Sequence, residues 1–93
     1  MSDEWHLYVL HCADGRLYAG ISTDPQRRLG EHAAGGQRAA KALRGKGPFA
    51  VVFTQLIGSR AEAQRAEYRF KQLTRPQKNK VIDQACFNWL DDA

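Results

Sequence analysis

The feature that most constrains the fold is a predicted hairpin near the start of the chain. Residues 5–11 (WHLYVLH) and 16–21 (RLYAGI) alternate in polarity and are rich in aromatic and branched side chains, so we expect both to be strands. Gly15 ends the short connection between them. Because successive strand residues point to opposite faces of a sheet, the length of this connection decides which side chains share a face.

Two connections fit these residues. A two-residue turn ending at Gly15 would send Tyr8 and Tyr18 to opposite faces of the sheet. A three-residue loop with a left-handed Gly15 in a bulge would pair Cys12 with Arg16 and place both tyrosines on one face. The residues of the turn leave this choice open, although it decides whether the two phenols can act together.

Helix signals follow the hairpin. Asp24 or Thr23 is the expected N-cap of a helix that has Pro25 in its first turn, where the missing N–H costs nothing. On this helix Arg28 and His32 are four residues apart and therefore share a face.

Residues 49–57 (FAVVFTQLI) are the most apolar segment, and we expect them to form the central strand. A capping box of Ser59 and Glu62 predicts the start of the next helix. Its core stripe consists of Ala63, Ala66, Phe70 and Leu73. After a break at Pro76 we expect a last helix bearing Val81, Ile82 and Ala85, and then packing of the chain end by Phe87 and Trp89.

Together these elements predict an α+β fold in which a small, three-stranded, mainly antiparallel sheet is flanked by helices in the order ββαβαα. A chain of 93 residues is expected to form one domain over residues 1–93, with a core of about residues 5–82.

Composition excludes several classes of protein. No stretch of about 18 apolar residues is present to span a bilayer, and the N-terminal MSDEW has neither a basic leader nor an apolar run, so we expect a cytoplasmic protein. Cys12 and Cys86 are the only cysteines, which rules out a disulfide framework or a four-cysteine zinc site. We expect both thiols to be inert.

Positive charge is concentrated in the middle of the chain. Residues 27–80 contain thirteen Lys or Arg against three Glu, a net charge of +10. Such a field is typical of proteins that bind a polyanion through phosphate contacts, although a solvated basic surface would look the same in sequence.

Glu67 occupies an unusual position at the edge of the predicted core stripe. One explanation is an i,i+4 ion pair with Lys71, which would contribute only a few tenths of a kcal/mol. The other is a functional carboxylate, which the residues alone do not favour.

The residues in this order resemble the GIY-YIG nuclease superfamily, and specifically its small stand-alone bacterial members. The first motif is HLY at residues 6–8 and the second is YAG at residues 18–20, with both tyrosines and the last glycine kept. Arg28 follows ten residues after the second tyrosine and His32 four residues later, as in the family. The metal-binding glutamate of the family matches Glu67.

Further offsets agree with the resemblance, which covers about Trp5 to Ile82. Pro76 and Asn79 lie nine and twelve residues after the glutamate, as in the excision-repair nuclease domain. Two positions depart from the family: Ile21 stands where excision-repair members have a lysine, and Ala42 stands where many stand-alone relatives have an aromatic residue.

The resemblance implies a metal-dependent DNA endonuclease acting on structured or damaged DNA. Glu67 would hold one Mg²⁺ or Mn²⁺, and Arg28 would bind the scissile phosphate. Tyr8 would be the general base with His32 as its proton relay, and Tyr18 would position water, although the two tyrosines could exchange roles.

Supporting roles follow from the same resemblance. Gly20 would let backbone and phosphate approach closely, and Asn79 would hold Glu67 or the phosphate by a hydrogen bond. Six cations form the predicted nucleic-acid-binding set: Arg27, Arg38, Lys41, Arg44, Lys46 and Lys78. The residues do not distinguish DNA from RNA, and a partner protein could supply specificity. The competing hypothesis is a catalytically weak nucleic-acid-binding domain within a DNA repair or processing complex.

Overall fold

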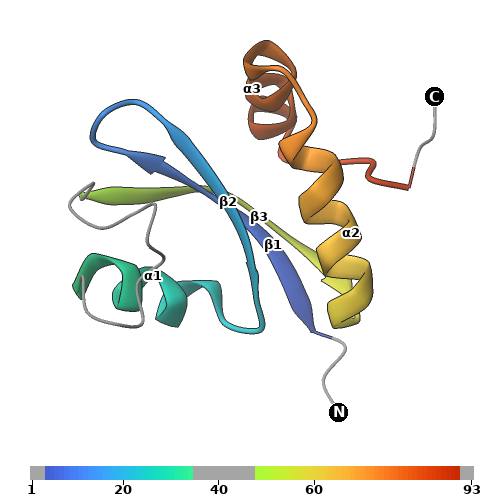
Figure 1. The fold of residues 1–93 in the computed structure, drawn as a ribbon, viewed down its shortest axis with the longest axis horizontal. Helices are drawn as coiled ribbons and strands as arrows, with labels where there is room; N and C mark the ends of the chain where they lie inside the picture. The colour runs from blue at the N-terminus through green and yellow to red at the C-terminus, as the bar shows by residue number, and fades with distance from the viewer. Residues whose placement is uncertain (1–3, 35–47, 91–93) are drawn as a thin grey trace.

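The computed structural model describes residues 4–34 and 48–90 (Figure 1). Its elements follow the predicted order ββαβαα, which confirms the α+β class. They are β1 (Trp5–Cys12), β2 (Leu17–Ser22), α1 (Pro25–Ala34), β3 (Phe49–Gly58), α2 (Arg60–Lys71) and α3 (Arg75–Gln84).

The sheet has the strand order β2-β1-β3, and β1 is antiparallel to both neighbours. The prediction that residues 49–57 form the central strand is therefore wrong, because β3 lies at an edge. The burial of the side chains explains the arrangement. Leu7, Val9 and Leu10 of β1 are fully buried, whereas Leu56 of β3 is 58% exposed. Strand β3 therefore contains more apolar side chains than its edge position in the sheet buries.

The hairpin uses the three-residue loop. The Cys12 N–H donates to the Arg16 carbonyl at 2.8 Å, the Gly15 N–H donates to the Cys12 carbonyl at 2.9 Å, and Gly15 has φ +89°. A positive φ of this size is accessible to glycine at little cost, which is why the bulge forms here. In the resulting register Leu10 pairs with Tyr18, two residues along from Tyr8. Both phenols consequently lie on one face.

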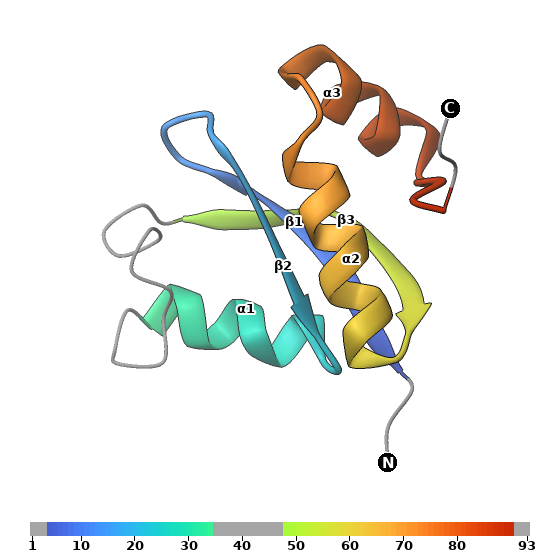
Figure 2. The ribbon, with the colours of Figure 1, turned by 45° about the vertical axis from the view of Figure 1, so that its right-hand side comes forward.

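Helices cover both faces of the sheet. Leu7, Val9 and Ala19 pack with Ala66 and Phe70 of α2 in one apolar cluster. A second cluster on the other face contains Tyr8, Leu10 and Cys12, with Tyr18 and Leu29 packed against it. Helices α1 and α2 accordingly lie on either side of β2 in both ribbon views (Figures 1 and 2).

The helix starts follow capping chemistry. Ser59 and Glu62 form the expected capping box of α2. A second capping box, Thr74 with Gln77, begins α3 one residue before Pro76. The structure corrects one expectation here. Ala85 is not a helical core residue: it is the exposed C-cap of α3, with φ +56°.

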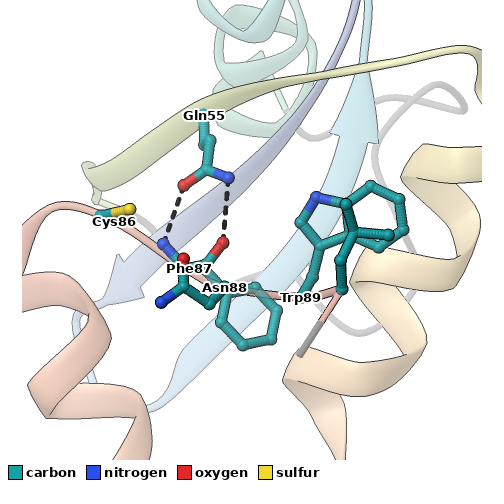
Figure 3. Close-up of a pocket in the computed structure, with 6 residues that line it drawn as sticks. Gln55, Cys86, Phe87, Asn88 and Trp89 are labelled. Atoms are coloured by element: carbon teal, nitrogen blue, oxygen red, sulfur yellow. Dashed lines mark hydrogen bonds between the residues drawn. The ribbon is translucent and has the colours of Figure 1, made fainter. Parts of the chain in front are cut away.

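The segment after α3 is tied back to β3. The Gln55 side chain accepts from the Phe87 N–H at 2.8 Å and donates to the Phe87 carbonyl at 3.0 Å, as a neighbouring strand would (Figure 3). Phe87 and Trp89 are buried, as predicted, and the Phe87 ring meets Phe70 edge-on at 5.7 Å. A cavity of about 420 Å³ lies beside this clamp, lined also by Cys86 and Leu90.

Neither cysteine forms a disulfide among the described residues; Cys12 is buried and Cys86 is exposed. Within the part of the chain that the structure describes, no helix has the length and apolarity needed to span a bilayer.

Candidate active site

Tyr8 is the buried centre of the site, and Gly20 makes room for it. The two residues are paired across β1 and β2, and the Tyr8 side chain is 2% exposed. A Cβ atom on Gly20 would lie 2.5 Å from the Tyr8 Oη and 2.6 Å from its Cζ. The phenol therefore lies across the bare backbone of β2. We predicted that Gly20 admits a phosphate, but the group that fills the space beside it is the tyrosine.

His32 links the two phenols. Its Nε2 is 3.0 Å from the Tyr8 Oη, a buried hydrogen bond, and its side chain is 1% exposed. The Tyr18 ring meets the imidazole edge-on, with the ring centroids 5.8 Å apart. His32 lies on helix α1. Asp24 caps the N-terminus of this helix, because its side chain accepts from the Arg27 N–H at 3.1 Å. Asp24 rather than Thr23 is thus the cap.

Burial shifts the pKa values of Tyr8, Tyr18 and His32 and so determines which of them carries a proton. It raises the pKa of Tyr8 to about 12, reinforced by the neighbouring Tyr18 and Glu67 and opposed by the Arg28 guanidinium. The pKa of Tyr18 is raised by burial and by Glu67. Burial lowers the pKa of His32, and the Arg28 charge lowers it further. At neutral pH both phenols are protonated and the imidazole is neutral, so His32 can accept a proton.

Arg28 is held between the phenol and a carboxylate. Its Nη1 donates to Glu31 Oε1 at 2.8 Å, and a hydrogen bond from its side chain lowers the pKa of Tyr8. Glu31 also receives Arg27 Nη1 on Oε2 at 3.4 Å. Sequence reasoning missed Glu31 as a site residue. The i,i+3 and i,i+4 spacing from the two arginines could have identified it.

Glu67 approaches from α2, on the other side of β2. The predicted ion pair with Lys71 is present, with Nζ 3.5 Å from Oε2. The carboxylate is nevertheless near enough to raise the pKa of both Tyr8 and Tyr18 by its negative charge. The ion pair is therefore present, and the functional role of this carboxylate stays a prediction.

Asn79 is hydrogen-bonded to Arg75 and not to Glu67, and its other predicted partner, the phosphate, stays a prediction. Its Oδ1 accepts from Arg75 Nε at 3.0 Å, and Arg75 Nη1 donates to the Gly15 carbonyl at 3.0 Å. Asn79 is exposed and supports a bridge from α3 to the hairpin loop instead of holding Glu67.

The nucleic-acid-binding set is only partly described. Arg27 is 60% exposed and pairs with Asp24 and Glu31. The Lys78 ammonium lies 5.8 Å from the centroid of the Phe70 ring. The other four members, Arg38, Lys41, Arg44 and Lys46, lie outside the described residues.

The donor set suits a single weakly held hard cation. Among residues 4–34 and 48–90, no three His, Cys, Asp or Glu side chains are arranged to hold a metal ion. Of the two carboxylates near the phenols, Glu31 is engaged by Arg27 and Arg28, and Glu67 is the one whose charge raises both phenol pKa values. A divalent ion that takes oxygen ligands and keeps most of its own waters fits one such carboxylate, whereas a fully protein-coordinated ion does not.

Comparison with known proteins agrees with this geometry. The model of the GIY-YIG catalytic domain matches residues 4–80. A UPF0213 protein of Cronobacter sakazakii is 54% identical over 80 residues, covering 86% of this chain and 82% of that protein. A UPF0213 protein of Yersinia pestis is 56% identical over 86 residues, covering 90% and 88%.

Two solved structures are similar in fold. The solution NMR structure of a UPF0213 protein from Bacillus halodurans has a TM-score of 0.57 and 38% identity, covering 92% of this chain and 89% of that one. The solution NMR structure of a protein from E. faecalis has a TM-score of 0.60 and 37% identity, covering 90% of each. The fold is that of a nuclease superfamily, and with the family match extending over residues 4–80 the chain belongs to the GIY-YIG family.

Proposed function

We propose that this chain is a metal-dependent endonuclease that hydrolyses phosphodiester bonds of structured or damaged DNA. The observation that carries the proposal is the buried hydrogen bond between Tyr8 and the neutral His32, with Arg28 and Glu67 acting on the same phenol. Simple packing accounts for a buried tyrosine, but it does not require an imidazole, a guanidinium and a carboxylate around one hydroxyl group.

The phenol and the imidazole form a proton path. A tyrosine whose pKa is about 12 cannot accept a proton from water at neutral pH while it keeps its own. In the tautomer that leaves Nε2 unprotonated, the Tyr8 O–H donates to His32. Tyr8 can then take a proton from the attacking water as it passes its own to the imidazole. Tyr18, on the same face, positions the water or the phosphate.

Two groups on opposite sides of β2 would act on the negative charge of the phosphate. Arg28 forks onto the non-bridging oxygens and offsets the negative charge that builds in the transition state. Glu67 would hold one Mg²⁺ or Mn²⁺, which would stabilise the phosphate and the departing 3′ oxygen. Sequence is read through contacts with base edges, and none of the roles assigned above is such a contact, so a partner protein is expected to supply specificity.

One observation favours a second candidate function. Glu67 is paired with Lys71, and Arg28 with Glu31, so both groups needed for hydrolysis are engaged by neighbours on their own helices. A catalytically weak nucleic-acid-binding domain, acting within a repair or processing complex, is compatible with such pairing.

Flapped, branched and linear DNA incubated with the protein in Mg²⁺ or Mn²⁺ separates the two functions. Nicking is expected in the native protein, and Tyr8→Phe should slow it by about 10²- to 10⁴-fold because the proton path is lost. Glu67→Ala should abolish it. Nicking that persists in Glu67→Ala would mean contamination, and salt-sensitive binding with no nicking would support the second function.

A further inference from the structure

The exposed side of α2 carries an aromatic side chain beside two arginines. Ala61, Gln64, Arg65, Tyr68 and Arg69 line a shallow depression of about 550 Å³, which we name the α2 outer surface. Tyr68 is 66% exposed, among the most exposed large apolar side chains of the described residues. The buried stripe of α2 faces the sheet, so this depression opens on the opposite side of the helix.

The charges on this surface are mostly of one sign. Arg65 and Arg69 are four residues apart on one face of α2 and line the depression beside Tyr68. No acid is among the residues that line the depression: Glu62 accepts the Ser59 N–H in the capping box, although its charge also acts on Arg65, and Glu67 is turned toward Lys71 and the phenols. Guanidinium groups bind phosphates, and a tyrosine ring offers a face for a base. The chemistry of this surface matches an unpaired nucleotide.

The surface lies around the axis of α2 from Glu67 of the candidate active site. Tyr68 follows Glu67 directly, which turns it by about 100° around the helix axis. Around the axis of α2, Lys71 lies between Glu67 and Tyr68, and its ammonium group ion-pairs with Glu67. A helix with its side chains is about 10–12 Å across, so a strand whose phosphate lies at Glu67 reaches Tyr68 after a short run of nucleotides.

We propose that the α2 outer surface binds an unpaired segment of the substrate strand, with Tyr68 stacked on a base and Arg65 and Arg69 on the flanking phosphates. This inference rests on the proposed function, because the strand reaches the surface from Glu67. A base within a duplex already stacks on its neighbours, so the surface selects DNA with a single-stranded arm, such as a flap, over continuous duplex.

Binding measured without divalent cation tests the inference apart from cleavage. Fluorescence anisotropy would compare a labelled single strand with a blunt duplex of the same sequence. Tyr68→Ala should weaken single-strand binding by about 5- to 100-fold while Tyr68→Phe keeps it, since stacking needs only the ring. Arg65→Ala should weaken both ligands and lower the salt slope by about one. Arg16→Ala removes the same charge from the hairpin loop, where the side chain is 78% exposed, and serves as the control.

The outcomes separate this inference from the proposed function. Single-strand binding by Tyr68→Ala at the native affinity overturns the inference, and so does a Tyr68→Phe variant as weak as Tyr68→Ala. If the native protein binds no DNA, the inference and the proposed function both fail. If it binds single strands through Tyr68 but does not nick DNA, the inference stands and the second candidate function gains support.

Discussion

A single buried hydroxyl group organises the candidate active site. The Tyr8 phenol lies across the Gly20 backbone and contacts His32, and the charges of Arg28 and Glu67 act on it from opposite sides of β2. Burial makes the phenol a poor base by itself, because it disfavours the phenolate. The neutral imidazole is therefore the group that gives the hydroxyl a place to send its proton.

Gly20→Ala should displace this phenol. The added Cβ would overlap the ring, and overpacking of this kind costs about 1–3 kcal/mol. Urea denaturation measures the loss, and nicking activity should fall with it. Gly30→Ala is the matched control: it lies within α1, nothing stands within 4 Å of its Cβ, and it should stabilise the protein by about 0.5–1 kcal/mol. Equal stabilities of the two variants would show that the phenol does not occupy the space at Gly20.

His32 should make folding stability depend on pH. Its folded-state pKa is lowered from 6.5 by burial and by Arg28, so folding favours the neutral imidazole. The stabilisation is complete above about pH 6.5 and is lost as the pH falls through the lower folded-state value. His32→Gln keeps a polar partner for Tyr8 but cannot titrate. Between about pH 7.5 and pH 5 the native protein should lose more unfolding free energy than this variant, whose carboxylates and Arg28 are unchanged. Parallel losses would contradict the assignment.

At the level of elements, local chemistry was predictable and strand order was not. The α2 capping box, the shared face of Arg28 and His32 and the final aromatic packing all follow from short-range spacing. The Thr74 and Gln77 box carried the same signal and was overlooked. The position of β3 depends on which strand is covered on both faces, which is a property of the assembled sheet and not of its apolar count.

The hairpin loop and Asn79 mark two limits of sequence reasoning. The letters of the loop fit two turns, and only the Cys12 to Arg16 hydrogen bond decides between them. Asn79 kept its family offset, yet its amide is used by Arg75 one helical turn away. An offset fixes which element carries a side chain, but competition among neighbouring donors decides what that side chain binds.

The end of α3 offers a simple gain in stability. Ala85 is the non-glycine residue with positive φ among those described, and a left-handed alanine costs about 1–2 kcal/mol. Ala85→Gly should therefore raise the unfolding free energy by up to about 1 kcal/mol in a urea titration. Ala61→Gly, in the first turn of α2, should lower it by a similar amount. A loss of stability in Ala85→Gly would show that residue 85 does not adopt the left-handed backbone conformation.

At the scale of the whole molecule, the distribution of positive charge indicates where a nucleic acid would bind. Among the described residues, α1 neutralises much of its own charge, because Glu31 pairs with both Arg27 and Arg28. By formal charge α2 carries four cations against Glu62 and Glu67, and α3 carries three against Asp83. The net +10 of residues 27–80 also includes Arg38, Lys41, Arg44 and Lys46, which sequence analysis assigns to phosphate binding.

Replacing Arg38, Lys41, Arg44 and Lys46 with glutamine should change the salt dependence of binding as well as the affinity. Each phosphate contact releases counterions, so the slope of log affinity against log salt for duplex DNA should become less steep by about 0.9 per lost contact, or about 3–4 in all. Anisotropy titrations at several salt concentrations measure it. Arg60→Gln, on an exposed residue stacked over Trp5, controls for loss of charge in general. An unchanged slope with weaker binding would mean that these four cations act only by long-range attraction, and that the phosphates are contacted elsewhere on the basic surface.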